Sequence, residues 1–469
     1  MKNFLECVHH FVWGAPALIL IISVGLLLSW RLNFVQFRLF PEALKGFLRQ
    51  FRPGRPDGRD SSFQALCTAL AATVGTGNLV GVAGAICLGG PGSIFWMWLC
   101  GILAMVTKYC EATLAVRYRV PTKDGFKGGP MYIIRQGLPE KWHVLAYCYG
   151  FFGLLASFGV GNITQINAAL TGIREASSLL GFHAGKSFDF TLGAVLAAVI
   201  GVFLSGGARR IYSVTEKLVP FAAAGYILLC LGVLCLNAQE IPNAFFRILR
   251  GAFSPRAVTG GMIGSGFQAL RVGCSRGVFT NEAGMGTASI AHAGAKNVHP
   301  AAQGLMGIME VFLDTLVICT LTALVILVSG VPVPFGTDAG GELTSRAFQA
   351  IYGPGAAVWL AAIMTLFAVA AVVGWGFYGA RCAEFLFGPK AWRYFSAMQI
   401  LTVFLGPVLE TSFVWLLAET VNGLMAIPNL ITLAILTPEV VRLTKEYRKS
   451  GVSDAGGGNY ANFHQCKPL

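Results

Sequence analysis

The stretch "ATVGTGNLVGVAG" at residues 72–84 decides how this chain folds. It carries no charge and lies inside a long apolar region, as a membrane-spanning helix would. Yet it holds four glycines and two threonines, and Gly75-Thr76-Gly77-Asn78 is a poor helix former. Backbone groups released from a helix in hydrocarbon are costly unless protein, water or a ligand satisfies them. The stretch therefore predicts a broken helix that lines a cavity.

The composition places this broken helix in a polytopic membrane protein. Of 469 residues, 55% are hydrophobic and only 12% are charged, whereas about 25% of a soluble protein is charged. We therefore expect an all-α membrane protein with about 11 transmembrane helices. The apolar segments that predict these spans lie near 12–30, 62–90, 91–116, 144–172, 188–206, 218–236, 257–295, 301–330, 356–379, 394–410 and 412–437.

The basic residues predict the orientation of the spans. With the N-terminus outside, the connecting segments on the cytoplasmic side hold 25 Lys and Arg and those outside hold 7. Such a bias over short loops is the positive-inside signal. The net charge of +13 is thus read as topology and not as nucleic-acid binding. We expect a multi-pass protein of the plasma (cytoplasmic or inner) membrane with its C-terminus in the cytoplasm.

A second interrupted span is expected at 257–295, where "GVFTNEAGMGTASIAHAG" fills residues 277–294. The two broken spans are five apart and run in opposite directions, which is the pattern of an inverted-repeat transporter. The spacing predicts two five-span halves. The expected units are an N-terminal span and basic linker at 1–61, the first repeat at 62–236, the second repeat at 257–437 and a disordered cytoplasmic tail at 438–469.

A break of this kind offers two kinds of chemistry. The half-helix that begins near Asn78 presents free N–H groups, from Thr76 through Gly77, that suit a carboxylate. The half-helix that ends near Val74 leaves carbonyls from Ala72 onward that suit a sodium ion. The alternative is that the glycines only permit close helix packing.

Two charged pairs at membrane depth have competing interpretations. Glu282, beside the second break, either lines the cation path or pairs with Arg276, six residues earlier. Lys108 and Glu111 lie three residues apart near a helix end, and we expect a salt bridge that reaches the surface.

Two further carboxylates share one helical face in the span at 301–330. Glu310 and Asp314 are four residues apart, and charges at this depth face the protein interior. They either take part in coupling or gating, by attracting cations or carrying a proton, or they pair with Arg271 or Lys108.

Four long blocks of the sequence resemble the alanine or glycine:cation symporter family. With the spans between them they cover nearly the whole chain after the first loop. The blocks are "GTGNLVGVAGAICLGGPGSIFWMWLCGILAMVTKYCEATLAVRYR" (75–119), "GGPMYI" (128–133), "RGVFTNEAGMGTASIAHAGAKNVHPAAQGLMGIMEVFLDTLVICTLTALVILVSG" (276–330) and "GWGFYGARCAEFLFG" (374–388).

The resemblance implies a LeuT-like fold and uptake of a small neutral amino acid, alanine or glycine, driven by Na+. Some members prefer glutamine, and coupling to H+ and a preference for serine or glutamine stay open as alternatives. Carried over by motif, the substrate-binding residues would be Thr76, Gly77, Asn78, Gln165, Asn281, Met285 and Trp375. Met285 and Trp375 would wall the side-chain pocket. The block "NEAGMGTASIAHA" departs from the family's "NEAGLGSAPIAHA", and this change bears on the shape of that pocket.

The resemblance also implies where the coupling ion binds. LeuT-like folds place a cation between the first broken helix and the third helix of the second half. Ala72, Val74 and the hydroxyl of Thr365 are the candidate ligands, although a threonine in a helix commonly bonds its own backbone instead.

Other functions receive less support from the sequence. An uncoupled channel or facilitator would need a repeated ring of carbonyls, and the breaks occur once in each half. An enzyme would need a constellation of catalytic groups near one interface, which His292 and His299 do not build. No C-x-x-C or H-E-x-x-H pattern occurs. We therefore expect no cofactor and no metal other than Na+, with the oligomeric state left open.

Overall fold

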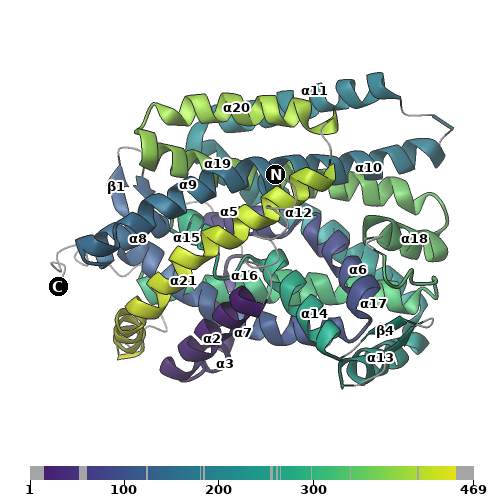
Figure 1. The fold of residues 1–469 in the computed structure, drawn as a ribbon, viewed down its shortest axis with the longest axis horizontal. Coiled ribbons are helices and arrows are strands. Elements are labelled where there is room, and N and C mark those ends of the chain that lie inside the picture. The colour runs from purple at the N-terminus through teal and green to yellow at the C-terminus, as the bar shows by residue number, and fades with distance from the viewer. Residues whose placement is uncertain are drawn as a thin grey trace.

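The computed structural model is almost entirely helical (Figure 1). It describes residues 15–449 apart from 52–60, 123–124, 180, 183–184, 254–256, 260–261, 265, 297, 338–339 and 409–410. Two short antiparallel hairpins are the exception among these residues. They are β1 (Val120–Thr122) with β2 (Gly125–Lys127), and β3 (Ala257–Thr259) with β4 (Met262–Gly264).

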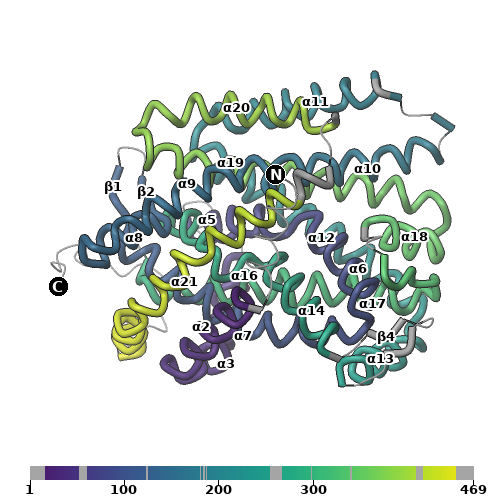
Figure 2. The backbone as a smooth tube through the Cα atoms, in the orientation of Figure 1, coloured from purple at the N-terminus to yellow at the C-terminus, as the bar shows by residue number. Residues whose placement is uncertain are grey.

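Seven helical segments of the described residues are long and apolar enough to cross a membrane, or eight if one bent pair counts as a span. This confirms a multi-pass membrane protein. The seven are α7 (Ser93–Arg117), the run Glu140–Leu179, α11 (Lys186–Ser205), α12 (Gly207–Leu236), the run Pro300–Val328, α19 (Ala356–Phe387) and α21 (Thr411–Lys449). Shorter helices also lie in predicted spans: α2 (Ala15–Arg31) and α20 (Ala391–Leu405). In Figure 2, α11 and α20 lie side by side along one edge of the molecule.

The first predicted break is confirmed. Helix α5 (Ser61–Thr73) ends just before the glycines, α6 (Gly77–Gly89) begins within them, and the two axes differ by 43°. The bend follows from the local sequence, because Gly75 and Gly77 are weak helix formers on either side of Thr76.

The second predicted break is also confirmed, although the helix before it begins later than the predicted span. Helix α14 (Gly266–Asn281) is followed by α15 (Thr287–His292). Between them Gly284 and Gly286 have φ values of 89° and 79°, which only glycine adopts without cost. Glu282 also has a positive φ of 53°, and a non-glycine residue there signals a constrained backbone.

Two predicted spans contain π-helical segments. In the fourth, η2 (Gly159–Ile163) joins α9 (Val144–Phe158) to α10 (Thr164–Leu179). In the eighth, η4 (Phe312–Cys319) joins α16 (Pro300–Val311) to α17 (Thr320–Val328). Such segments often mark functional sites, and here η4 contacts α6 and α14, while η2 contacts α10 and α19.

The structure corrects several predicted boundaries. Residues 257–264 form the β3–β4 hairpin instead of the start of a span, because their short glycine-punctuated segments pair with one another. Residues 438–449 continue helix α21 instead of belonging to a disordered tail, and 450–469 lie outside the described residues. Short helices also occupy predicted loops: α3 (Val35–Arg38), α4 (Phe40–Arg49), α8 (Pro130–Gly137), α13 (Ile241–Phe253) and α18 (Gly340–Tyr352), with 3-10 turns η1 (Glu140–Trp142) and η3 (Ala238–Glu240). A further 3-10 turn, η5 (Gly406–Val408), lies at the end of the predicted span 394–410.

Helices α7 and α16 pack closely because α16 presents glycines to α7. A Cβ atom on Gly307 would lie 2.6 Å from the carbonyl oxygen of Lys108, and one on Gly304 would lie closer still to the Thr113 hydroxyl. This approach brings Lys108 of α7 against Glu310 of α16. Glycine contacts of this kind are typical of helix packing in membranes.

We expect Gly307→Ala to destabilise the protein, because its new methyl group would meet backbone atoms that cannot move aside. Overpacking of this kind costs about 1–3 kcal/mol. Thermal unfolding in detergent, followed by tryptophan fluorescence, should show a lower midpoint. The control is Gly225→Ala in α12, whose Cβ atom would lie 3.7 Å from its nearest neighbour, Ile363. Equal midpoints for the two variants would contradict the packing described here.

Candidate functional site

The first break leaves backbone groups without partners. Among the described residues, the N–H of Thr76 donates to no acceptor, and the carbonyls of Ala71, Ala72 and Val74 accept from no donor. The Gly75 N–H does have a partner, the Asn78 Oδ1 atom at 2.9 Å. Unsatisfied donors and acceptors therefore sit side by side at the bend, as the sequence predicted.

The structure bears on whether the glycines of this break serve packing. A Cβ atom on Gly77 would lie 3.9 Å from Thr280 Cγ2, and one on Gly81 would lie 3.5 Å from the same atom. These are ordinary van der Waals distances, so neither glycine is required for close approach of α14. Gly77 instead leaves main-chain atoms uncovered, which suits direct contact with a ligand.

Two long helices flank the first break. From α10, Gln165 Oε1 accepts the Thr76 hydroxyl at 2.8 Å, and Gln165 Nε2 donates to the Val160 carbonyl of η2. From α19, Gly374 approaches Ala72 so closely that a Cβ atom would lie 3.0 Å from the Ala72 nitrogen. These helices are the third spans of the two predicted halves.

Thr365 is not brought to this break. Its hydroxyl donates to the Ala361 carbonyl of its own helix at 2.7 Å. The α19 residues that face the break are Ala371 and Gly374. Thr365 precedes Ala371 by six residues, which is about 9 Å along a helix axis at about 1.5 Å per residue.

A buried network joins the two breaks through Asp314 of η4. The Asn78 Nδ2 atom donates to Asp314 Oδ1 at 2.7 Å, and the Thr315 hydroxyl donates to Asp314 Oδ2 at 2.8 Å. The Asn281 Nδ2 atom in turn donates to the Thr315 hydroxyl at 3.2 Å. All four side chains are at most 1% exposed. Asp314 and Thr315 thus fix the first and second breaks relative to one another.

The second break is held by Glu111 of α7. One oxygen, Oε1, accepts the N–H groups of Gly284 and Gly286 at 3.0 and 3.1 Å and the Asn429 amide at 2.8 Å. Asn429 of α21 also donates to the Gly284 carbonyl. Glu111 is fully buried, so the expected surface salt bridge with Lys108 is wrong. The carboxylate instead satisfies backbone groups that the break would leave bare.

Glu282 also has partners that the sequence did not indicate. Its carboxylate accepts the Trp375 Nε1 proton at 2.9 Å and the Thr287 hydroxyl at 2.7 Å. The proposed pair with Arg276 does not form, because Arg276 contacts Glu419 of α21 at 3.6 Å. Glu282 therefore connects the second break to α19.

Glu310 belongs to a buried polar chain beside α15. Lys108 Nζ lies 2.7 Å from Glu310 Oε1, as one of the alternative interpretations predicted. His292 Nε2 lies 3.1 Å from Glu310 Oε2, and its Nδ1 atom lies 2.7 Å from Gln303 Nε2. Gln303 accepts a hydrogen bond from Ser62 at the start of α5. Arg271, the other suggested partner, is exposed.

The sequence signalled neither His292 nor Glu111 as part of the site. Their partners come from elements distant in sequence, and each residue taken alone resembles a helix-packing or surface residue. The membrane depth of Glu111 was the one available signal.

The two predicted pocket walls are fully buried. Met285 and Trp375 both have 0% exposure. Trp375 packs over Gly161 of η2, where a Cβ atom would come within 2.2 Å of the Trp375 side chain. The glycine in the π-helical segment thus makes room for the indole, and Glu282 fixes its orientation.

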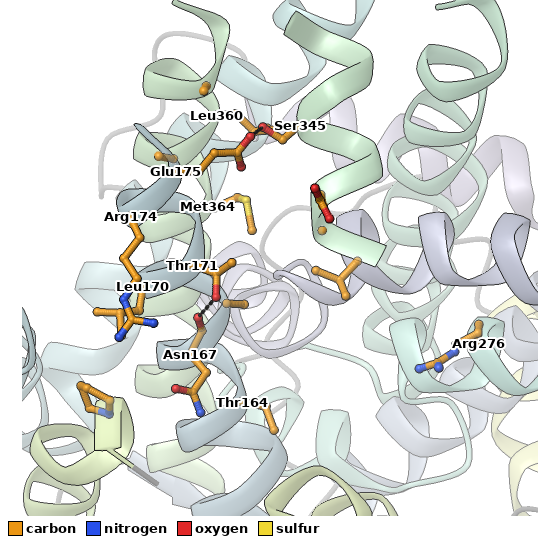
Figure 3. Close-up of a pocket in the computed structure, with 18 of the residues that line it drawn as sticks. Thr164, Asn167, Leu170, Thr171, Arg174, Glu175, Arg276, Ser345, Leu360 and Met364 are labelled. Atoms are coloured by element: carbon orange, nitrogen blue, oxygen red, sulfur yellow. Dashed lines mark hydrogen bonds between the residues drawn. The ribbon is translucent and has the colours of Figure 1, made fainter. Parts of the chain in front are cut away.

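A cavity of about 890 Å³ lies between α10, α14, α18 and α19 (Figure 3). Thr164, Asn167 and Thr171 of α10 line one side, and Arg276 of α14 stands across from them. Thr164 adjoins Gln165 in the chain, so the cavity reaches toward the first break without being lined by the predicted substrate-binding residues. We call this cavity the vestibule.

Comparisons with known proteins agree with this architecture. Residues 1–457 match the sodium:alanine symporter family. The sodium/alanine symporter AgcS of Methanococcus maripaludis is 40% identical, over 97% of this chain and 98% of its own. An uncharacterized transporter of Haemophilus influenzae is 39% identical, over 95% of this chain and 96% of its own. The probable sodium/glutamine symporter GlnT of Bacillus subtilis is 35% identical, over 96% and 91%.

A solved structure supports the fold. MhsT in complex with L-phenylalanine superposes with a TM-score of 0.55, covering 82% of this chain and 97% of its own, at 13% sequence identity. That likeness concerns the fold alone, which is that of LeuT-like transporters. With the family match over nearly its whole length, this chain belongs to the sodium:alanine symporter family, whose members are membrane transporters and not enzymes.

Proposed function

We propose that this protein imports a small neutral amino acid, alanine or glycine, by symport with Na+ through alternating access. The single observation that carries the proposal is the open backbone of the first break. The free Thr76 N–H can bind an anion, and the free carbonyls of Ala72 and Val74, a few residues away, can bind a cation. The named function of AgcS, a sodium/alanine symporter, agrees with it.

In this proposal the substrate lies between the two breaks. The backbone and side chains from Thr76 to Asn78 receive the carboxylate, since N–H groups and a helix N-terminus favour negative charge. Gln165 and Asn281 offer amide groups to the polar atoms of the substrate. Both are already held by partners beside the breaks.

Met285 and Trp375 close the side-chain end of the proposed site. Both side chains are fully buried, and the Trp375 indole is held by Glu282. Overpacking a well-packed core is costly, so a side chain much larger than a methyl group would be disfavoured. This supports alanine or glycine over larger amino acids.

The proposed Na+ site consists of the carbonyls of Ala72 and Val74, with α19 behind them. Thr365 is left out because its distance from the break argues against it. In this proposal Glu282, Glu310 and Asp314 affect the coupling of Na+ and substrate by holding the helices in place, and they do not bind either ligand. Asp314 links the breaks, Glu282 orients Trp375, and Glu310 is neutralised by Lys108.

We further propose that eleven spans form two inverted five-span halves after one extra span. Beyond the eight already described, α2, the α14–α15 pair and α20 would complete the eleven. The two breaks begin the halves, and α10 and α19 occupy equivalent third places beside the first break. With the N-terminus outside, the vestibule faces the exterior and is the path by which substrate enters.

Uptake into proteoliposomes tests this function. We expect radiolabelled alanine to accumulate only when Na+ is higher outside, because occupation of the carbonyls by Na+ favours substrate binding nearby. Glutamine and serine serve as competitors, and a proton gradient alone tests the H+-coupled alternative. Accumulation that persists after both gradients collapse would contradict symport and favour a facilitator.

The double variant Thr76→Val with Gly77→Ala tests the first break. It removes the hydroxyl bonded to Gln165 and places a methyl group over the free backbone, where the structure has room for it. Hydrogen bonds to charged groups contribute about 1.5–3 kcal/mol, so alanine binding should weaken at least tenfold by thermal shift. Thr365→Val with Gly225→Ala makes the same chemical changes elsewhere and should bind normally. Unchanged binding by the first pair would refute the assignment.

Thr315→Val tests the link between the breaks. It removes the hydroxyl that donates to Asp314 and accepts from Asn281, leaving buried polar groups short of a partner at a cost of about 1–3 kcal/mol. We expect slower uptake together with a lower unfolding temperature. Thr432→Val is the control, since that buried hydroxyl bonds only its own helix at Pro428. Equal behaviour of the two variants would show that the link is dispensable.

A further inference from the structure

Four basic side chains converge far from the proposed site, where the end of α2 meets the end of α21. They are Arg31 at the end of α2, Arg38 at the end of α3, and Lys445 and Arg448 near the end of α21. They line a surface cavity of about 70 Å³ whose floor includes Leu39 and Thr444. We call these four residues the basic corner. In Figure 1 it lies where the purple helices α2 and α3 approach the yellow end of α21.

The basic corner has no acidic partner in the part of the chain that the structure describes. The nearby carboxylates of Glu439 and Glu446 are both bound by Arg442. Arg38 makes a single long hydrogen bond, to the Asn33 carbonyl at 3.5 Å. Four like charges around one cavity repel one another, and an anion bound there would relieve this repulsion.

The backbone that presents two of these residues is unusually constrained. Asn33 and Phe34 are consecutive non-glycine residues with φ values of 51° and 54°. The backbone turn that they form is closed by a hydrogen bond from the Phe34 N–H to the Ser29 carbonyl at 2.7 Å. A left-handed phenylalanine is rare and costly. It persists here in a position that sets Arg31 and Arg38 on one cavity.

Exposed aromatic side chains lie on the same stretch of chain as Arg31 and Arg38. Trp30, Phe34 and Phe37 are 75%, 48% and 57% exposed. Aromatic residues next to basic ones are typical of the boundary between acyl chains and lipid headgroups. Arg31 ends the apolar helix α2, and Lys445 and Arg448 lie near the end of α21, so a basic corner there suits the surface of a membrane.

From these observations we propose that the basic corner binds the phosphate group of an anionic phospholipid. Arginine and lysine favour phosphate through charge-assisted hydrogen bonds, and basic pockets between membrane helices bind such headgroups. The cavity has room for a phosphate group, while the aromatic side chains contact the acyl region. The lipid would tie the α2–α3 corner to α21, the helix that also carries Asn429 at the second break.

Thermal unfolding in nanodiscs tests the proposal. Phosphatidylcholine discs are compared with discs in which a quarter of the lipid is phosphatidylglycerol. We expect the anionic lipid to raise the unfolding temperature by several degrees, and Arg38→Gln with Arg448→Gln to abolish most of that shift. The matched control is Lys45→Gln with Lys449→Gln, which removes the same charge from exposed positions outside the cavity. This control should keep the rise in unfolding temperature that the anionic lipid causes.

Three results would overturn the proposal. The first is no effect of phosphatidylglycerol on the wild type, and the second is an equal loss of the shift in both double variants. The third is an equal stabilisation by inorganic phosphate in phosphatidylcholine discs, which would assign the corner to a free anion. Native mass spectrometry gives a second readout that does not depend on stability: phosphatidylglycerol should stay bound to the wild type and the control and be lost from Arg38→Gln/Arg448→Gln.

Discussion

Where a helix is broken inside a membrane, its released backbone N–H and C=O groups need hydrogen-bond partners, and this constraint shapes the structure. The protein meets it differently at its two breaks. At the second break, buried side chains provide the partners. Glu111 and Asn281 accept hydrogen bonds from backbone N–H groups, and Asn429 donates to the Gly284 carbonyl. At the first, the Thr76 N–H and the carbonyls of Ala72 and Val74 stay free within the described residues. The first break therefore keeps a free backbone N–H beside free carbonyls, whereas at the second break side chains accept the N–H groups of Ala283, Gly284 and Gly286.

The second break is connected to the first one. Asp314 and Thr315 connect Asn78 to Asn281 by hydrogen bonds, so a movement of one break would displace the other. The second break is anchored to α7 and α21 by Glu111 and Asn429, and to α19 by Glu282 and Trp375. Since α21 also ends at the basic corner, a headgroup bound there would act on the same scaffold. Substrate, ion and lipid would then act on one connected set of helices.

The sequence was sufficient for features with a local signature. Apolar length located the seven or eight segments that can cross a membrane, and clustered glycines with threonine and asparagine located both breaks. Contacts between residues far apart in sequence left no such signature. Glu111 was read with its neighbour Lys108, although its partners are Gly284, Gly286 and Asn429. The helices in predicted loops, such as α4 and α18, were missed because their short apolar faces are stabilised by packing onto the bundle and not by hydropathy.

A cryo-electron microscopy structure of the protein with alanine and Na+ bound would locate both ligands relative to the first break. We expect the substrate carboxylate within hydrogen-bonding distance of the Thr76 N–H, with Na+ against the carbonyls of Ala72 and Val74. Density for the amino acid confined to the vestibule, with the first break unoccupied, would contradict it.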